Sequence, residues 1–185
     1  AMIPIVYMIS FHILLQKQIK EEEIDLKKAI LLTFIVVLWV NTHGSALFAP
    51  IYLGFYGVYY FVKSRTIKLY LIIKLFLLSI LALFINPFFG EIFLYAYKTA
   101  VVSKTRNISE WQMTFPTKEM WIEIFVFYVL GTYEIIKRYK QEGFKAFLHP
   151  LSLCFFFGIS ALRNIIWFFC FDKFLSFFRI RPLKF

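Results

Sequence analysis

An uncharged stretch at residues 29–62 constrains the fold of this chain more than any other feature. Nearly all of it is aliphatic or aromatic, and a polar island, Trp-Val-Asn-Thr-His-Gly at residues 39–44, interrupts it. As one helix, this stretch would be about 51 Å long, well beyond the ~30 Å hydrocarbon core of a bilayer. Two helices of about 15–17 residues that meet at the island fit a bilayer. We therefore predict a helical hairpin, with the island at or just below one membrane face.

The composition predicts that lipid is the solvent of this chain. Hydrophobic residues make up 61% of the sequence and the mean hydropathy is +0.71, which is more apolar surface than a soluble core of this size can hide. The formal net charge is +10, but the basic residues cluster between apolar runs, as in the cytoplasmic loops of membrane proteins. We expect membrane lipids as partners and no nucleic acid, because no basic stripe interleaves with aromatics on a soluble module.

Further apolar runs extend the prediction to an all-α fold, a polytopic transmembrane helix bundle of about seven spans. Residues 16–28 read as a mixed loop, and Lys74 is expected to pack inside the bundle or to snorkel. We treat residues 1–185 as a single transmembrane domain. The remaining predicted spans are residues 2–15, 69–85, 121–136, 147–162 and 165–178.

A long loop at residues 88–119 contains a predicted amphipathic helix that lies on the membrane surface. Glu91, Tyr95 and Lys98 fall on its polar side. Its apolar positions recur at helical spacing: Phe89, Ile92, Phe93, Ala96, Tyr97, Ala100 and Val101.

The distribution of Lys and Arg among the loops orients the bundle. The basic loops at 17–28, 63–68, 137–145 and 179–184 are predicted to be cytoplasmic, which leaves several polar clusters on the outer face. Polar groups that converge at membrane depth indicate a functional site. Among the residues of these clusters are groups suited to phosphate binding, sugar stacking and proton transfer. The predicted substrate-binding residues are Asn41, His43, Asn86, Glu110, Trp111 and Arg163.

Each cluster also has a structural interpretation. The island can be a tight turn between helices, and Asn86-Pro87 can simply end a helix. Trp111 can be an interfacial anchor, and Arg163 an ordinary flanking charge. No catalytic residue is assigned, although Glu110 is the best candidate for a base.

No metal and no cofactor are expected. The three His residues are scattered and no HExxH or Cys/His cluster occurs. Cys154 and Cys170 lie in apolar runs and are not spaced as a CxxC pair, so we expect them to be small buried hydrophobes.

The order of the motifs resembles a family. Four motifs are similar to those of a group of bacterial GT-C-like polytopic membrane glycosyltransferases: Trp-x-Asn-x-His-Gly at 39–44, Asn-Pro-x-x-Gly at 86–90, Ser-Glu-Trp at 109–111 and Arg-Asn at 163–164. The resemblance covers roughly residues 30–165. It implies transfer of a sugar from a polyprenyl-phosphate carrier, on the extracytoplasmic face of the bacterial inner membrane, with inversion at the sugar.

The resemblance also implies an acidic residue, usually Asp, in the first outer loop of the family. Asp25 is predicted to be cytoplasmic and Asp172 lies in or near the last span, so neither occupies that place. We therefore expect either a fragment of a longer enzyme or a relative without activity. A non-catalytic membrane subunit or scaffold of a larger complex is the alternative, and a transporter is a weaker one.

Overall fold

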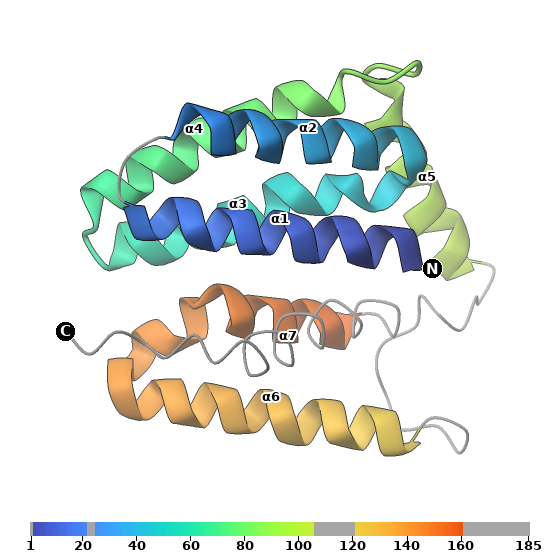
Figure 1. Cartoon of the computed structure of the whole chain (residues 1–185). Coiled ribbons are helices and arrows are strands. Elements are labelled where there is room, and N and C mark those ends of the chain that lie inside the picture. Colours follow the sequence, from blue (N-terminus) through green and yellow to red (C-terminus); the bar gives the residue numbers. More distant parts are fainter. Residues whose placement is uncertain (1, 22–24, 106–120, 161–185) are drawn as a thin grey trace. The chain divides into compact units, whose positions relative to one another are not determined.

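The computed structural model describes residues 2–21, 25–105 and 121–160. That part of the chain is helical and contains no strand, which confirms the all-α prediction (Figure 1). The helices are α1 Met2–Glu21, α2 Leu26–Thr42, η1 Gly44–Leu47, α3 Phe48–Val62, α4 Thr66–Leu83, α5 Glu91–Thr105, α6 Trp121–Glu142, η3 Gly143–Leu148 and α7 Pro150–Ser160.

The chain divides into two compact units. Unit 1 comprises Ala1–Ser103 together with Leu148–Pro150, and unit 2 comprises Lys104–Phe147 together with Leu151–Phe185. The prediction of a single domain stays a prediction, and each unit is described by itself below.

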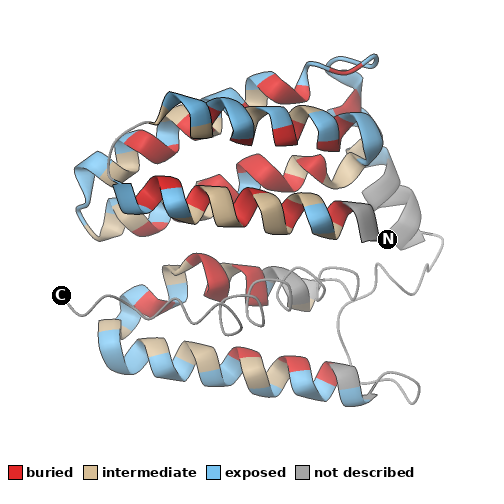
Figure 2. Ribbon diagram, viewed as in Figure 1, coloured by how far each residue is buried: buried red, intermediate tan, exposed pale blue. Residues whose placement is uncertain are grey.

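Four long helices form the body of unit 1. The closely packed pairs are α1 with α2, α2 with α4, and α3 with α4. The inward sides of these helices carry the buried residues (Figure 2). Helix α4 therefore packs against both α2 and α3. These two helices are successive in the chain, but each packs more closely on α4 than on the other.

The turn between α1 and α2 is shorter than predicted. Residues 16–21 continue α1 and residues 26–28 begin α2, so the expectation of a loop over 16–28 was wrong. Gln, Lys and Glu are good helix formers and can extend a helix beyond its apolar part. The Asp25 carboxylate caps α2 by accepting from Lys27 N at 2.9 Å, and its hydrogen bond with the Lys28 ammonium lowers the pKa of Asp25.

The predicted break at the polar island is confirmed. Helix α2 ends at Thr42, and His43 adopts an extended conformation before the short 3₁₀ helix η1 leads into α3. The chain reverses its direction at this point (Figure 1). The helix-stop prediction at Asn86-Pro87 also agrees with the structure, because α4 ends at Leu83.

Hydrogen bonds between side chains join α1 to α3. His12 Nδ1 lies 2.8 Å from the Tyr52 hydroxyl, and one turn further along both helices Gln16 Nε2 donates to the Tyr56 hydroxyl. The two hydroxyls are 3.3 Å apart. His12 and Tyr52 are only 2% and 3% exposed. Interhelical hydrogen bonds of this kind stabilise helix pairs that lipid surrounds.

We expect Tyr52→Phe to destabilise unit 1 by about 1–3 kcal/mol, because the substitution removes the hydroxyl and leaves the His12 ring without that partner. Denaturant titration in detergent, followed by circular dichroism, measures the change. Tyr70→Phe is the control, since Tyr70 is exposed and should give a change near zero. Equal effects of the two substitutions would contradict the prediction.

Two segments of the described chain are long and apolar enough to cross a membrane. They are Gly44–Val62 and Thr66–Leu83. Large apolar side chains are exposed along α2 and α4, including Phe34, Leu38, Ile73 and Leu77. Two possible spans and an apolar outer surface support a membrane protein.

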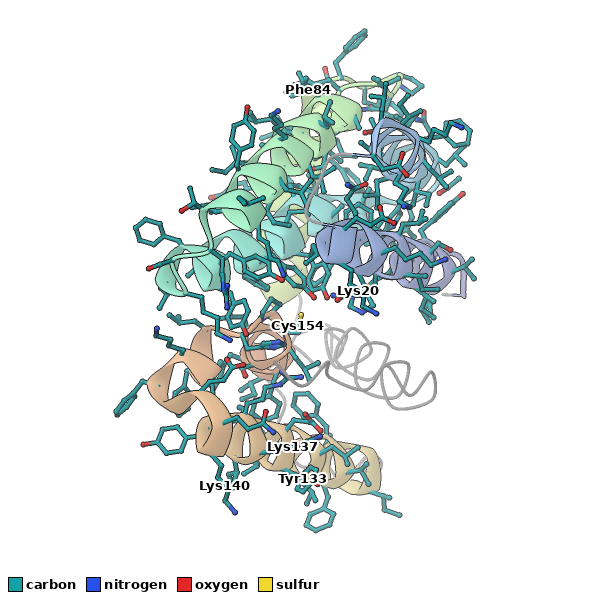
Figure 3. All side chains as sticks on the ribbon, turned by 60° about the vertical axis from the view of Figure 1, so that its left-hand side comes forward. Lys20, Phe84, Tyr133, Lys137, Lys140 and Cys154 are labelled. Atoms are coloured by element: carbon teal, nitrogen blue, oxygen red, sulfur yellow. The ribbon has the colours of Figure 1, made fainter. Side chains whose placement is uncertain are left out.

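Unit 2 pairs α6 with α7. Gly131 of α6 faces the Phe155 ring of α7 at such close range that a Cβ built on Gly131 would lie 2.1 Å from that ring. The Phe155 ring also packs on Phe127. Cys154 is buried, as predicted, whereas Tyr133, Lys137 and Lys140 project from α6 (Figure 3). Cys170 lies outside the described residues.

Candidate functional site

A pocket of about 600 Å³ lies in unit 1 where α2 ends and α5 begins. One wall is the end of α2 with the polar island, and the other is the first turns of α5 with the turn before it. The lining residues are Val40, Asn41, Thr42, His43, Gly44, Phe88, Glu91, Ile92, Leu94, Tyr95 and Lys98.

The imidazole of His43 is held in place by the residues of its own turn. The Ser45 backbone N–H donates to His43 Nδ1 at 3.1 Å, and the Ser45 hydroxyl lies 2.8 Å from the same atom. A ring nitrogen that accepts a hydrogen bond carries no proton, so the neutral ring carries its proton on Nε2. The turn therefore fixes both the position and the tautomer of His43.

The buried side chain of Trp39 holds this turn in place from the core side. Its indole is fully buried, and Nε1–H donates to the Ser45 hydroxyl at 3.0 Å. The ring also stacks near Tyr7 of α1. A hydrogen-bonded chain thus runs from the core, through Ser45, to the imidazole at the pocket. Because the indole is buried, its N–H needs a hydrogen-bond partner inside the protein, and the Ser45 hydroxyl of the island's turn is that partner.

Asn41 ties the pocket end of α2 to the end of α4. Its Nδ2 donates to Val37 O within α2 and to Ile85 O beyond α4, both at 2.8 Å. The side chain is exposed at the pocket. Asn41 therefore has a structural role as well as a place in the lining.

The wall from α5 presents polar side chains at helical spacing. Glu91, Tyr95 and Lys98 stand at positions i, i+4 and i+7, so they lie on one face of the helix. A Cβ on Gly44 would lie 3.8 Å from the Tyr95 ring, which shows how closely the two walls approach. The polar side of the predicted amphipathic helix thus faces the pocket.

Asn86 is placed differently from the other predicted residues. Its amide donates to Leu83 O and, at 3.2 Å, to Phe89 O, while its Oδ1 accepts from Phe88 N at 2.8 Å. The side chain is buried and is not among the lining residues of the pocket. It shapes the turn that places Phe88 and Glu91 at the pocket.

The structure brings Asn41 and His43 together at one pocket. Glu110, Trp111 and Arg163 lie outside the described residues. The site list drawn from the sequence omitted Thr42, Glu91, Tyr95 and Lys98, which line the pocket. The periodicity of α5 placed three of these on one face, but only the fold shows that this face lies against the polar island.

The pocket combines groups that suit a ligand with both polar and apolar parts. Lys98 supplies a positive charge, and Glu91 a carboxylate. Asn41, Thr42 and His43 supply hydrogen-bonding groups, and apolar side chains complete the lining: Val40, Phe88, Ile92 and Leu94. No cluster of metal-binding side chains occurs among the described residues.

These features define a class of protein: a helical protein with possible membrane spans and a polar pocket at one end of a four-helix unit. Comparison with protein-family models, with curated proteins and with solved structures found no match to this chain.

Proposed function

We propose that this chain is part of a multi-pass membrane protein that resembles the GT-C glycosyltransferases and uses a polyprenyl-phosphate-linked sugar on the extracytoplasmic face. The observation that carries the proposal is the pocket, where a cation, a carboxylate, an amide and an imidazole stand beside apolar side chains. A sugar phosphate joined to a polyprenyl chain has the same combination of chemical parts.

The charge distribution of unit 1 supports the orientation. The end formed by the start of α2 and the turn between α3 and α4 is rich in basic residues: Lys27, Lys28, Lys63, Arg65 and Lys68. The end of α2 and the start of α5, which line the pocket, lie at the other end of these helices (Figure 1). Under the positive-inside rule, the basic end is cytoplasmic and the pocket faces outward.

In this proposal, different lining residues bind the three parts of the ligand. The Lys98 ammonium pairs with the phosphate, while Glu91 and the Nε2–H of His43 bind sugar hydroxyls. Tyr95 packs on the apolar face of the sugar ring. Phe88 and Leu94 contact the first isoprene units.

The rest of the proposed architecture follows from the predicted bundle. About seven helices span the bacterial inner membrane, and α5 lies at its outer surface with its polar side toward the pocket. Glu110, Trp111 and Arg163 complete the outer face in this proposal.

Binding of a polyprenyl phosphomannose and of free polyprenyl phosphate to the protein in nanodiscs tests the proposal. We expect Lys98→Gln to weaken binding of both lipids by about 10–100-fold, because a charge-assisted contact to phosphate is lost. Native mass spectrometry or a fluorescent lipid analogue gives the dissociation constants.

Lys74→Gln is the matched control, since Lys74 is another lysine of unit 1 but does not line the pocket. It should bind both lipids as the unsubstituted protein does. Equal weakening in both variants, or no binding by the unsubstituted protein, would contradict the proposal.

The alternative is a non-catalytic membrane subunit. The observation in its favour is the exposed aromatic surface, which includes Phe34, Phe61 and Phe144. Such surface suits either lipid or a neighbouring subunit. Failure to bind either polyprenyl lipid, together with co-purification of a stoichiometric membrane partner, would favour this alternative.

A further inference from the structure

The turn between α3 and α4 concentrates positive charge at the end of unit 1 away from the pocket. Lys63 and Arg65 lie in the turn, and Lys68 lies in the first turn of α4. No Asp or Glu occurs in the sequence between Asp25 and Glu91. The turn itself contains no acidic residue, and the carboxylates of Glu21 and Asp25, near the start of α2, pair with Lys28.

Aromatic rings of α3 hold two of these cations at the surface. The Lys63 ammonium lies 4.7 Å from the centre of the Tyr59 ring, and the Lys68 ammonium lies 6.0 Å from that of Tyr60. Tyr59 is itself buried and packs edge-on against His149 at 4.9 Å. The rings restrict where the lysine side chains can reach, so the charges stay near the turn.

Large apolar side chains flank the same turn. Phe61 is 71% exposed and Ile67 is 62% exposed. Tyr70, one turn further along α4, is 59% exposed, and the Lys74 ammonium lies 4.1 Å from the centre of its ring. The Lys74 ammonium therefore lies beside an exposed ring of α4, and whether it packs inside the bundle or snorkels stays a prediction.

Cations at the level of the turn and apolar groups beside them match one kind of ligand. An anionic phospholipid places a negative headgroup at the membrane surface and its acyl chains along the adjacent apolar helix. A nucleic acid also matches the charge, but it has no apolar part for Phe61 and Ile67.

We propose that the turn between α3 and α4 is a binding site for the headgroup of an anionic phospholipid. Lys63, Arg65 and Lys68 bind the headgroup phosphate. The acyl chains lie against the outer side of α4, beside Ile67 and Ile73. This site is separate from the pocket and does not depend on the function proposed for it.

The test uses the full chain in nanodiscs made from an equimolar mixture of dioleoylphosphatidylglycerol and dioleoylphosphatidylcholine. Lipids that remain bound on release from the nanodisc are identified by native mass spectrometry. We expect about tenfold enrichment of phosphatidylglycerol over phosphatidylcholine. The variant K63Q/R65Q/K68Q should lose this enrichment.

The matched control is K137Q/K140Q/K145Q, which removes the same number of charges from exposed lysines of unit 2. It should retain the enrichment. Circular dichroism checks that each variant is folded, and if the first variant is not, Arg65→Gln and Arg65→Lys replace it. Arg65→Gln should then reduce the enrichment several-fold, and Arg65→Lys should restore most of it.

The proposal is overturned if phosphatidylglycerol is not enriched, or if the two triple variants lose enrichment equally, since the total charge alone would then explain binding. Retention of a single-stranded RNA oligonucleotide in place of phosphatidylglycerol would overturn it in favour of nucleic-acid binding. None of these results bears on the polyprenyl-lipid test of the pocket.

Discussion

Trp39→Ala is expected to lower the free energy of unfolding of unit 1 by about 3–5 kcal/mol. The indole is fully buried and is the largest of the fully buried side chains among the described residues. Its removal leaves a cavity between α1 and α2 and takes the Nε1–H donor away from Ser45. Denaturant titration in detergent, followed by circular dichroism, measures the loss.

Trp39→Phe separates the two contributions of the indole. The ring of Phe fills much of the space, so the loss should fall to about 1–2 kcal/mol, including the missing hydrogen bond. Ligand binding at the pocket should weaken in this variant, because Ser45 then holds the His43 ring less firmly. Near-equal stability of Trp39→Ala and the unsubstituted protein would show that the indole is not packed as described.

Gly131→Ala should destabilise the α6–α7 pair of unit 2 by about 3 kcal/mol. The new Cβ would lie 2.1 Å from two atoms of the Phe155 ring and 2.8 Å from its Cγ, so the ring or a helix must shift. Phe155 is buried against Phe127 and Tyr128, which leaves the ring little room to turn. Thermal unfolding in detergent, with limited proteolysis between α6 and α7, measures the effect.

Gly54→Ala is the matched control for this substitution. Gly54 lies in α3, and a Cβ there would meet nothing within 4 Å. Alanine is the better helix former, so the control should stabilise the protein by about 0.5–1 kcal/mol. The prediction is contradicted if both substitutions shift the stability in the same direction by similar amounts.

Most helices of unit 1 could be predicted from the apolar runs of the sequence and from the residues that end helices. The polar island at 39–44 and Asn86-Pro87 both mark helix ends, because His43 accepts from Ser45 N at the start of η1 and Asn86 donates to Leu83 O at the end of α4. The extents were harder to predict. Five of residues 16–21 are polar, yet the segment is helical, since polarity alone does not end a helix whose residues favour helix formation.

The candidate site could be predicted only in part. Asn41 and His43 stand out because polar groups are costly in apolar surroundings. Lys98 and Tyr95 stand on an ordinary amphipathic helix, where such residues usually face water. Their place at the pocket depends on how the turn around Asn86 directs α5, and that is a tertiary property which helical periodicity does not contain.

The packing of α4 against both α2 and α3 has a consequence for how the protein is made. A ribosome delivers α2 and α3 to the membrane before α4, so these two helices are synthesised before the helix on which both of them pack. The contact from Asn41 to Ile85 likewise waits for the end of α4. Nascent chains that end shortly after Val62 should therefore remain open to proteolysis, and protection should arise late, once residue 85 has left the ribosome.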